Sequence, residues 1–529
     1  MKNLLDMLKD PETCARSLRE RVPGYIRLTF CAAVLLGFGT HLYMFTNKFA
    51  NLDDLPSMFF TGYGIQSGRW LLPAAAGLDG DFSYPWLIGV LSVLCLAGAA
   101  CFSVSLLRIR RPLSCILAAA LVVTFPASAD TLAFMFTADA YFLSFLLAAF
   151  GAWAAVRWGW WGSAAGAAAI TLSLGIYQAY FPVAAVLMVG ALLLGTLDGE
   201  KTFKELFLKG LRLVGTLAAG MAVYLIIVKI TTRGVPLTDY KGLADMGQIS
   251  LRELPGMICS AYKEYYRFFL RDDLNFHAGF WWIAIVLVGL GSLAAGIALL
   301  WKKKLGPART ALALLLAAIY PLAGSLLTVM GVQGKLTVRM LYGLLYILLL
   351  PIGLVEHTAD SLGQGRTRVF HAGLSWVVTV TMLTAAWNYA LVDNSAYLKA
   401  DFTMHQCEAY SNRLLERIES CEGYGPWLDV VLVGSDRWTW DLNIMPQMED
   451  IHIYGVMNLP DLRLTYSYDH FLHYFLGFPA VVYLGDSEEA KTIEKTEELK
   501  QMSLYPQSGS VKLLHYEPDD KDMIVVRLG

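Results

Sequence analysis

Long apolar stretches, separated by short polar or basic connections, occupy most of this chain. Each stretch is roughly long enough to cross the 30 Å or so of hydrocarbon in a bilayer. The pattern predicts about eleven transmembrane helices, although the third, fifth and sixth are short. They lie approximately at residues 25–45, 85–107, 112–125, 138–156, 162–178, 182–197, 213–230, 278–301, 311–330, 340–355 and 370–390.

The pattern changes after residue 390, where the apolar stretches stop. A helical pattern covers residues 393–422, and short runs rich in β-branched residues follow at 429–434, 480–485, 511–515 and 523–528. These runs predict a small α/β domain. The run Val430-Val431-Leu432-Val433-Gly434 is not followed by a G-x-G-x-x-G motif, so nothing supports nucleotide binding.

Composition agrees with a chain that is mostly embedded in a bilayer. Of its 529 residues 56% are hydrophobic and 16% charged, with a mean hydropathy of +0.49. The formal charge of −2 averages a membrane part with basic loops and a tail of mixed charge, and we see no feature typical of nucleic-acid binding. The eight cysteines lack metal-ligand spacing.

The distribution of Lys and Arg predicts the topology. With the N-terminus inside, basic connections such as those at Arg108, Lys201 and Lys302 fall on the cytoplasmic side, as the positive-inside rule requires. An odd number of spans then leaves the C-terminal domain outside. We expect a cytoplasmic N-terminus (1–24), a transmembrane domain (25–392) and an extracytoplasmic α/β domain (393–529).

The outer connections contain charged residues suited to group transfer. Asp53 and Asp54 follow the first span, and a carboxylate there can take the proton of an attacking hydroxyl. Arg69, Lys335 and Arg339 can stabilise the charge on a leaving phosphate. The alternatives are that the two carboxylates cap a helix or face water, and that the basic residues anchor to lipid headgroups.

Three further candidates lie where spans meet the outer surface. Asp139 begins a span, where an ionisable group is either functional or favoured by the helix dipole. Tyr177 and Gln178 lie between two short spans and can hydrogen-bond a sugar. Their alternatives are hydrogen bonding between helices and an interfacial aromatic belt.

Several short motifs, taken in order, resemble the GtrII-like membrane glucosyltransferases of the GT-C class. The resemblance extends over nearly the whole chain, and no single motif is specific. Its carriers are Asp53-Asp54, Gly68-Arg69-Trp70, Ala138-Asp139-Ala140, Gly175-Ile176-Tyr177-Gln178, Tyr505-Pro506-Gln507-Ser508-Gly509-Ser510-Val511-Lys512 and Ile524-Val525-Val526-Arg527-Leu528.

The resemblance implies a GT-C-like fold in a bacterial cytoplasmic (inner) membrane. It also implies that glucose, or a similar hexose, passes from a polyprenyl-phosphate-linked donor on the outer leaflet to a cell-envelope glycan, with inversion. A base in the first outer loop is implied too, and we prefer Asp53 slightly over Asp54. Some members of the class use a divalent metal, but two neighbouring aspartates do not require one, so we expect no obligatory metal.

Two other classes of function fit the same pattern. A transporter or flippase of a lipid-linked sugar would also have many spans with buried polar residues, although we find no internal repeat between the two halves. A non-catalytic envelope scaffold would bind a ligand with its outer domain. In that case loss of Asp53 and Asp54 would be harmless.

Overall fold

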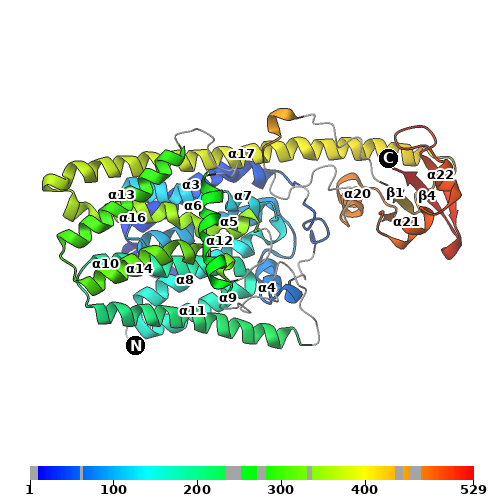
Figure 1. Cartoon of the computed structure of the whole chain (residues 1–529). Helices are drawn as coiled ribbons and strands as arrows, with labels where there is room; N and C mark the ends of the chain where they lie inside the picture. Colours follow the sequence, from blue (N-terminus) through cyan, green and yellow to red (C-terminus); the bar gives the residue numbers. More distant parts are fainter. Residues whose placement is uncertain are drawn as a thin grey trace.

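The computed structural model describes residues 10–49, 51–59, 64–233, 252–270, 281–330, 336–434, 445–451 and 466–528. Among these residues, nine helices are long and apolar enough to cross a membrane, which confirms the predicted helical, multi-pass fold (Figure 1). They are α3 (Gly24–Thr46), α5 (Pro85–Leu106), α8 (Ala138–Arg157), α10 (Phe181–Leu197), α11 (Phe203–Thr231), α13 (Trp281–Lys302), α14 (Pro307–Gly324), α16 (Tyr346–Leu362) and α17 (Arg368–Glu419).

The other two predicted spans also form helices, α6 (Pro112–Thr124) and α9 (Gly159–Ile176). α6 has 13 residues, which corresponds to about 20 Å at 1.5 Å per residue. Pro126 stands just beyond its end, where proline disfavours helical geometry in the preceding residue. The described shorter helices are α2 (Pro11–Arg21), α4 (Leu72–Ala76), α7 (Ala127–Leu132), α12 (Leu254–Leu270), α15 (Leu326–Val329), α20 (Tyr468–Leu476), α21 (Glu488–Ile493) and α22 (Glu497–Gln501).

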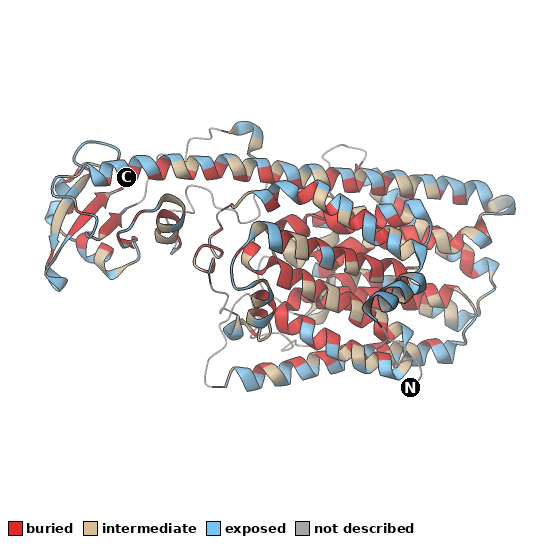
Figure 2. Cartoon of the chain, turned by 180° about the vertical axis from the view of Figure 1, so that it is seen from behind, coloured by how far each residue is buried: buried red, intermediate tan, exposed pale blue. Residues whose placement is uncertain are grey.

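Small residues allow the helices of the bundle to approach closely. A Cβ atom on Gly166 of α9 would lie 2.7 Å from the carbonyl oxygen of Gly151 on α8, and one on Gly162 would lie 2.1 Å from the oxygen of Ala154. Such backbone proximity gives dispersion contacts that stabilise helix pairs where lipid removes the hydrophobic driving force. Buried residues accordingly fill the interior of the bundle (Figure 2).

α17 is a single helix of 52 residues that joins the bundle to the C-terminal domain (Figure 1). At 1.5 Å per residue it is about 78 Å long, far more than a bilayer requires. The expected boundary at 392/393 lies inside it. Buried polar contacts hold it to the bundle: His41 Nδ1 lies 2.7 Å from the Tyr397 hydroxyl, and His41 Nε2 lies 2.7 Å from the carbonyl oxygen of Val123.

The C-terminal domain contains a four-stranded mixed sheet, as its β-branched runs predict. The order is β2-β1-β4-β3, with β1 parallel to β2 and β4, and β3 antiparallel to β4. β1 pairs Val430 with Ile524 of β4, and β3 pairs Val511 with Val526. The strands are β1 (Val430–Val433), β2 (Val482–Tyr483), β3 (Val511–Tyr516) and β4 (Lys521–Arg527).

Basic connections gather at one end of the bundle. The Arg108 guanidinium makes two 2.7 Å hydrogen bonds to the Asp198 carboxylate, and Lys303 Nζ donates to the carbonyl oxygen of Asp198 at 3.1 Å. Because α5 separates Tyr84 from Arg108, the first loop lies at the opposite end, where α17 carries the C-terminal domain (Figure 1). Which end faces the cytoplasm stays a prediction.

Candidate functional site

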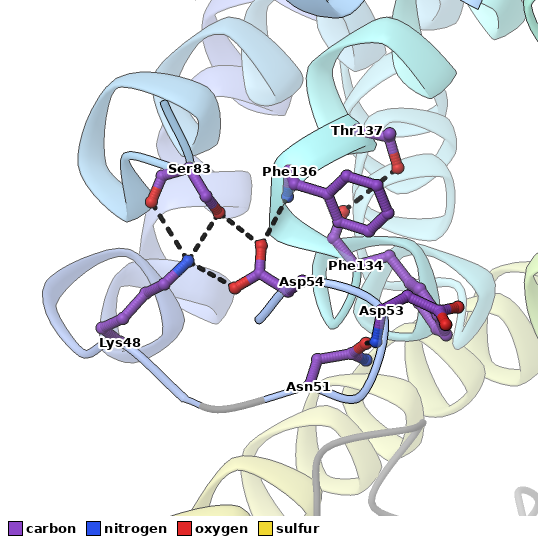
Figure 3. Close-up of polar contacts among 8 residues, drawn as sticks. All are labelled: Lys48, Asn51, Asp53, Asp54, Ser83, Phe134, Phe136 and Thr137. Atoms are coloured by element: carbon purple, nitrogen blue, oxygen red, sulfur yellow. Dashed lines mark hydrogen bonds and ion pairs between the residues drawn. The ribbon is translucent and has the colours of Figure 1, made fainter. Parts of the chain in front are cut away.

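The Asp54 carboxylate is buried in a network that closes the first loop onto the bundle. Lys48 Nζ lies 2.5 Å from Asp54 Oδ2, and Asp54 Oδ1 accepts from Ser83 Oγ at 2.5 Å and from the Phe136 N–H at 3.0 Å (Figure 3). Lys48 Nζ also donates to the Ser83 carbonyl oxygen and hydroxyl. With a side chain only 1% exposed and three donors around it, Asp54 holds the loop in place.

Asp53 occupies a different environment, although it is the next residue. Its carboxylate points away from the Lys48 network (Figure 3), and its side chain is half-buried rather than enclosed. The Asp53 N–H donates to Asn51 Oδ1 at 2.9 Å, which sets the turn. Its Oδ1 accepts from the Tyr466 hydroxyl at 2.5 Å, so the C-terminal domain reaches this carboxylate.

Arg69 lies beside a stacked pair of tyrosines. Its Nη1 donates to the Tyr141 hydroxyl at 2.9 Å, and its guanidinium lies 4.9 Å from the centre of the Tyr177 ring. The rings of Tyr141 and Tyr177 are themselves stacked with centres 4.2 Å apart. Hydrogen bonding and cation–π attraction therefore fix the position of this positive charge.

Two motifs distant in sequence meet directly here. The Leu71 N–H donates to the Gly175 carbonyl oxygen at 2.8 Å, and a Cβ atom on Gly175 would lie 2.5 Å from the Trp70 ring. Gln178 Nε2 donates to the Ser67 carbonyl oxygen at 3.0 Å. Only glycine fits against Trp70, so the Gly68-Arg69-Trp70 and Gly175–Gln178 motifs form one packed unit.

Arg339 is held by Asp130, a contact across 209 residues. The Asp130 carboxylate accepts from the Arg339 N–H at 2.7 Å and from its Nη1 at 3.1 Å. The guanidinium also lies 3.8 Å from the centre of the Phe134 ring. Lys335, the third predicted cation, lies outside the described residues.

Asp139 is buried at the start of α8, and its Oδ1 accepts the Ala140 N–H at 2.7 Å. In the first loop, burial raises the pKa of Asp79, and the charge of Asp81 adds to the effect. Among the described residues, no group of three or more His, Cys, Asp or Glu side chains could hold a metal ion, and metal dependence stays untested.

The segment from residue 130 to residue 141 brings most of the candidates together. Within it, the Asp130 carboxylate binds Arg339 and the Phe136 N–H donates to Asp54. The same segment contains Asp139 and Tyr141, whose hydroxyl binds Arg69. Asp53 joins this group only through the loop that it shares with Asp54.

Sequence reasoning missed the partners that fix these side chains. The sequence patterns do not single out Lys48, Ser83, Tyr141 or Tyr466. Lys48 and Ser83 gave a weak signal, since both stand in the first outer loop beside a span. Tyr466 gave none, because its contact with Asp53 spans 413 residues.

Comparison with known proteins bears on the same region. The family model "Glucosyl transferase GtrII" matches residues 42–350. The chain belongs to this family. The match covers the GtrII motifs from Asp53 to Gln178, whereas the motifs at residues 505–512 and 524–528 lie beyond it. The predicted family is confirmed, and membership implies a glycosyltransferase. No curated protein and no solved structure matches the chain.

Proposed function

We propose that this GtrII family protein transfers glucose, or a similar hexose, from a polyprenyl-phosphate-linked donor to a cell-envelope glycan on the outer face of the cytoplasmic membrane. One observation carries the proposal. A partly exposed carboxylate, Asp53, and two fixed guanidinium groups, Arg69 and Arg339, lie at the end of the bundle that also carries the C-terminal domain. Acid–base chemistry and phosphate stabilisation are the two functions that sugar transfer from a lipid phosphate requires.

Asp53 is the base in this proposal. An acceptor hydroxyl attacks the anomeric carbon, its proton passes to Asp53, and the carbon–oxygen bond to the lipid phosphate breaks with its electrons leaving on the phosphate. A single displacement inverts the anomeric centre. Asp54 is less suited because Lys48, Ser83 and the Phe136 N–H already surround it.

Arg69 and Arg339 stabilise the departing phosphate. Both are charged at any physiological pH, and each is fixed by aromatic and polar contacts, so little reorganisation accompanies the reaction. Both guanidinium groups lie at the same end of the bundle as Asp53, so in this proposal the donor phosphate binds beside them.

An apolar cavity offers a place for the lipid chain. It has a volume of about 300 Å³ and lies between α10, α13, α14 and α16, where it extends along α16 from Ile347 to Leu354. The first residue of α16 that lines the cavity is Ile347, eight positions after Arg339 in the chain. Its lining is almost entirely aliphatic, as a polyprenyl chain requires.

The test is sugar transfer by the purified protein in nanodiscs, with radiolabelled polyprenyl-phosphate glucose and envelope glycan. We expect Asp53→Asn to lower kcat by about a hundredfold or more without changing the melting temperature. Asp81→Asn, an exposed carboxylate of the same loop, is the matched control and should retain activity.

Two results would contradict the proposal. Wild-type protein that transfers no sugar with both substrates present would favour a transporter or scaffold. Full activity in folded Asp53→Asn would remove Asp53 from the mechanism, and the Asp54→Asn variant would then be decisive.

A further inference from the structure

Between the first loop and the C-terminal domain lies a row of exposed aromatic rings, here called the aromatic platform and made of Phe59, Phe82, Tyr84 and Tyr474. Phe59 packs edge-on against Phe82, with ring centres 5.8 Å apart, and against Tyr474, with centres 5.0 Å apart. Phe82 and Tyr84 are 5.4 Å apart. All four rings are between 44% and 52% exposed, which is unusual for large rings packed together.

The platform is continuous with the candidate catalytic loop. Phe82 and Tyr84 flank Ser83, whose hydroxyl binds Asp54, and the Ser83 N–H donates to the Met58 carbonyl oxygen at 3.0 Å. Tyr474 lies on α20 of the C-terminal domain. Just before that helix, Tyr466 binds Asp53, and Ser467 Oγ donates to the Leu52 carbonyl oxygen at 2.5 Å. The platform therefore joins the first loop to the C-terminal domain, whose Tyr466 binds the proposed base.

We infer that the aromatic platform binds the acceptor as a chain of pyranose rings, an inference that rests on the proposed function. The C–H face of a pyranose is apolar, and the electron-rich face of an aromatic ring attracts it. Polar groups that can bind sugar hydroxyls lie alongside, since His470 packs against Tyr474 and its Nδ1 lies 2.7 Å from Asp469 Oδ1. A glycan held there would present a hydroxyl to Asp53.

A lipid surface fits these observations less well. Tyr474 and His470 belong to the domain that carries the β-sheet, which α17 holds beyond the end of the bundle (Figure 1). Headgroup anchors are expected at the start of a span, where Tyr84 is the N-cap of α5 and Trp86 has 54% of its surface exposed, whereas Phe59 and Tyr474 stand at no span start. Trp86 therefore provides a control for membrane anchoring.

The test measures binding of lipid-free envelope polysaccharide to the full-length protein in nanodiscs, without donor, by biolayer interferometry. We expect Phe82→Ala and Tyr474→Ala each to weaken Kd by about tenfold, the fold-change that corresponds to one aromatic contact. Phe82→Tyr and Tyr474→Phe keep a ring face and should bind like wild type. Trp427→Ala, an exposed aromatic elsewhere in the C-terminal domain, and Trp86→Leu should leave Kd unchanged.

The outcomes separate this inference from the proposed function. If the wild type transfers glucose and the platform variants keep the same Kd and KM for polysaccharide, the role of the platform in acceptor binding is overturned and the proposed function stands. Wild type that binds polysaccharide through the platform but transfers nothing would overturn the donor reaction alone. If Phe82→Ala and Trp86→Leu lowered the stability of the protein in nanodiscs equally, the platform would be assigned to lipid contact. If Phe82→Ala dissociated a dimer, the platform would be assigned to contact with a second copy of the chain.

Discussion

Replacing Asp54 by alanine tests whether the first loop is held by a buried ion pair. The substitution would leave the Lys48 ammonium, whose side chain is 23% exposed, without its carboxylate. It would also remove the acceptor for Ser83 Oγ and for the Phe136 N–H. Breaking a buried pair costs about 3–5 kcal/mol. Because Lys48 keeps the Ser83 carbonyl oxygen as an acceptor and is partly exposed, we expect about 3 kcal/mol.

A double-mutant cycle with Lys48→Met isolates the pair from the other contacts. The unfolding free energy can be measured by steric trapping in bicelles, with Asp53→Ala as the control. We expect Asp53→Ala to cost less than about 1 kcal/mol, since an exposed hydrogen bond contributes little. If Asp54→Ala cost less than about 1 kcal/mol, Asp54 would not be the residue that holds the loop. If the effects of Asp54→Ala and Lys48→Met on the unfolding free energy were additive, the ion pair between these two residues would not contribute to holding it.

Two further predictions concern packing and pH. Gly175→Ala should lower stability by about 1–3 kcal/mol in thermal unfolding, because the added Cβ would overlap the Trp70 ring. Gly195→Ala is the control, since a Cβ there would have no neighbour within 4 Å. Equal melting temperatures of the two variants would disprove the close packing at Gly175. The hydrogen bond to Asp522 raises the pKa of His515 in the folded protein. Its contribution to stability should therefore be complete below the unfolded pKa of about 6.5 and should disappear as pH rises through the folded pKa. Asp522→Asn should reduce this pH dependence of the melting temperature, leaving the smaller part that is due to Asp520, and an unchanged profile would show that the His515–Asp522 pair does not stabilise the domain.

The spans and strands could be predicted from the sequence because each depends on a local pattern. Every predicted span overlaps a helix, since a stretch that crosses lipid must be apolar and must satisfy its own backbone hydrogen bonds. Two spans differ in detail: 311–330 is divided at Ser325 between α14 and α15, and 340–355 begins in short 3-10 turns before α16. The four β-branched runs correspond to β1 to β4. α17 differs, because the sequence pattern predicts two elements, at residues 370–390 and 393–422. No proline or glycine separates them, and the helix continues from lipid into water.

The roles of the charged residues could not be predicted, because they depend on long-range contacts. Asp53 and Asp54 are neighbours in sequence, and their partners in the fold distinguish them: Asp54 binds Lys48, Ser83 and the Phe136 N–H, and Asp53 binds Tyr466. The partner of Arg339 is 209 residues away. Sequence indicated which residues could carry charge chemistry at the outer connections, whereas tertiary packing decides which remain accessible.

Because α17 is unbroken, its length determines both the direction in which the C-terminal domain faces around the helix axis and the distance of that domain from the bundle. An α-helix advances 1.5 Å and turns by about 100° for every residue. A single residue inserted where α17 emerges from the bundle would therefore swing α20 around the helix axis while hardly lifting it. Tyr466 and Tyr474 would then face away from the first loop, although every individual domain remained intact. Insertions of about eighteen residues, five full turns, would restore the direction but place the domain about 27 Å too far from the membrane. The length of this helix therefore has almost no freedom to vary if the C-terminal domain is to meet Asp53.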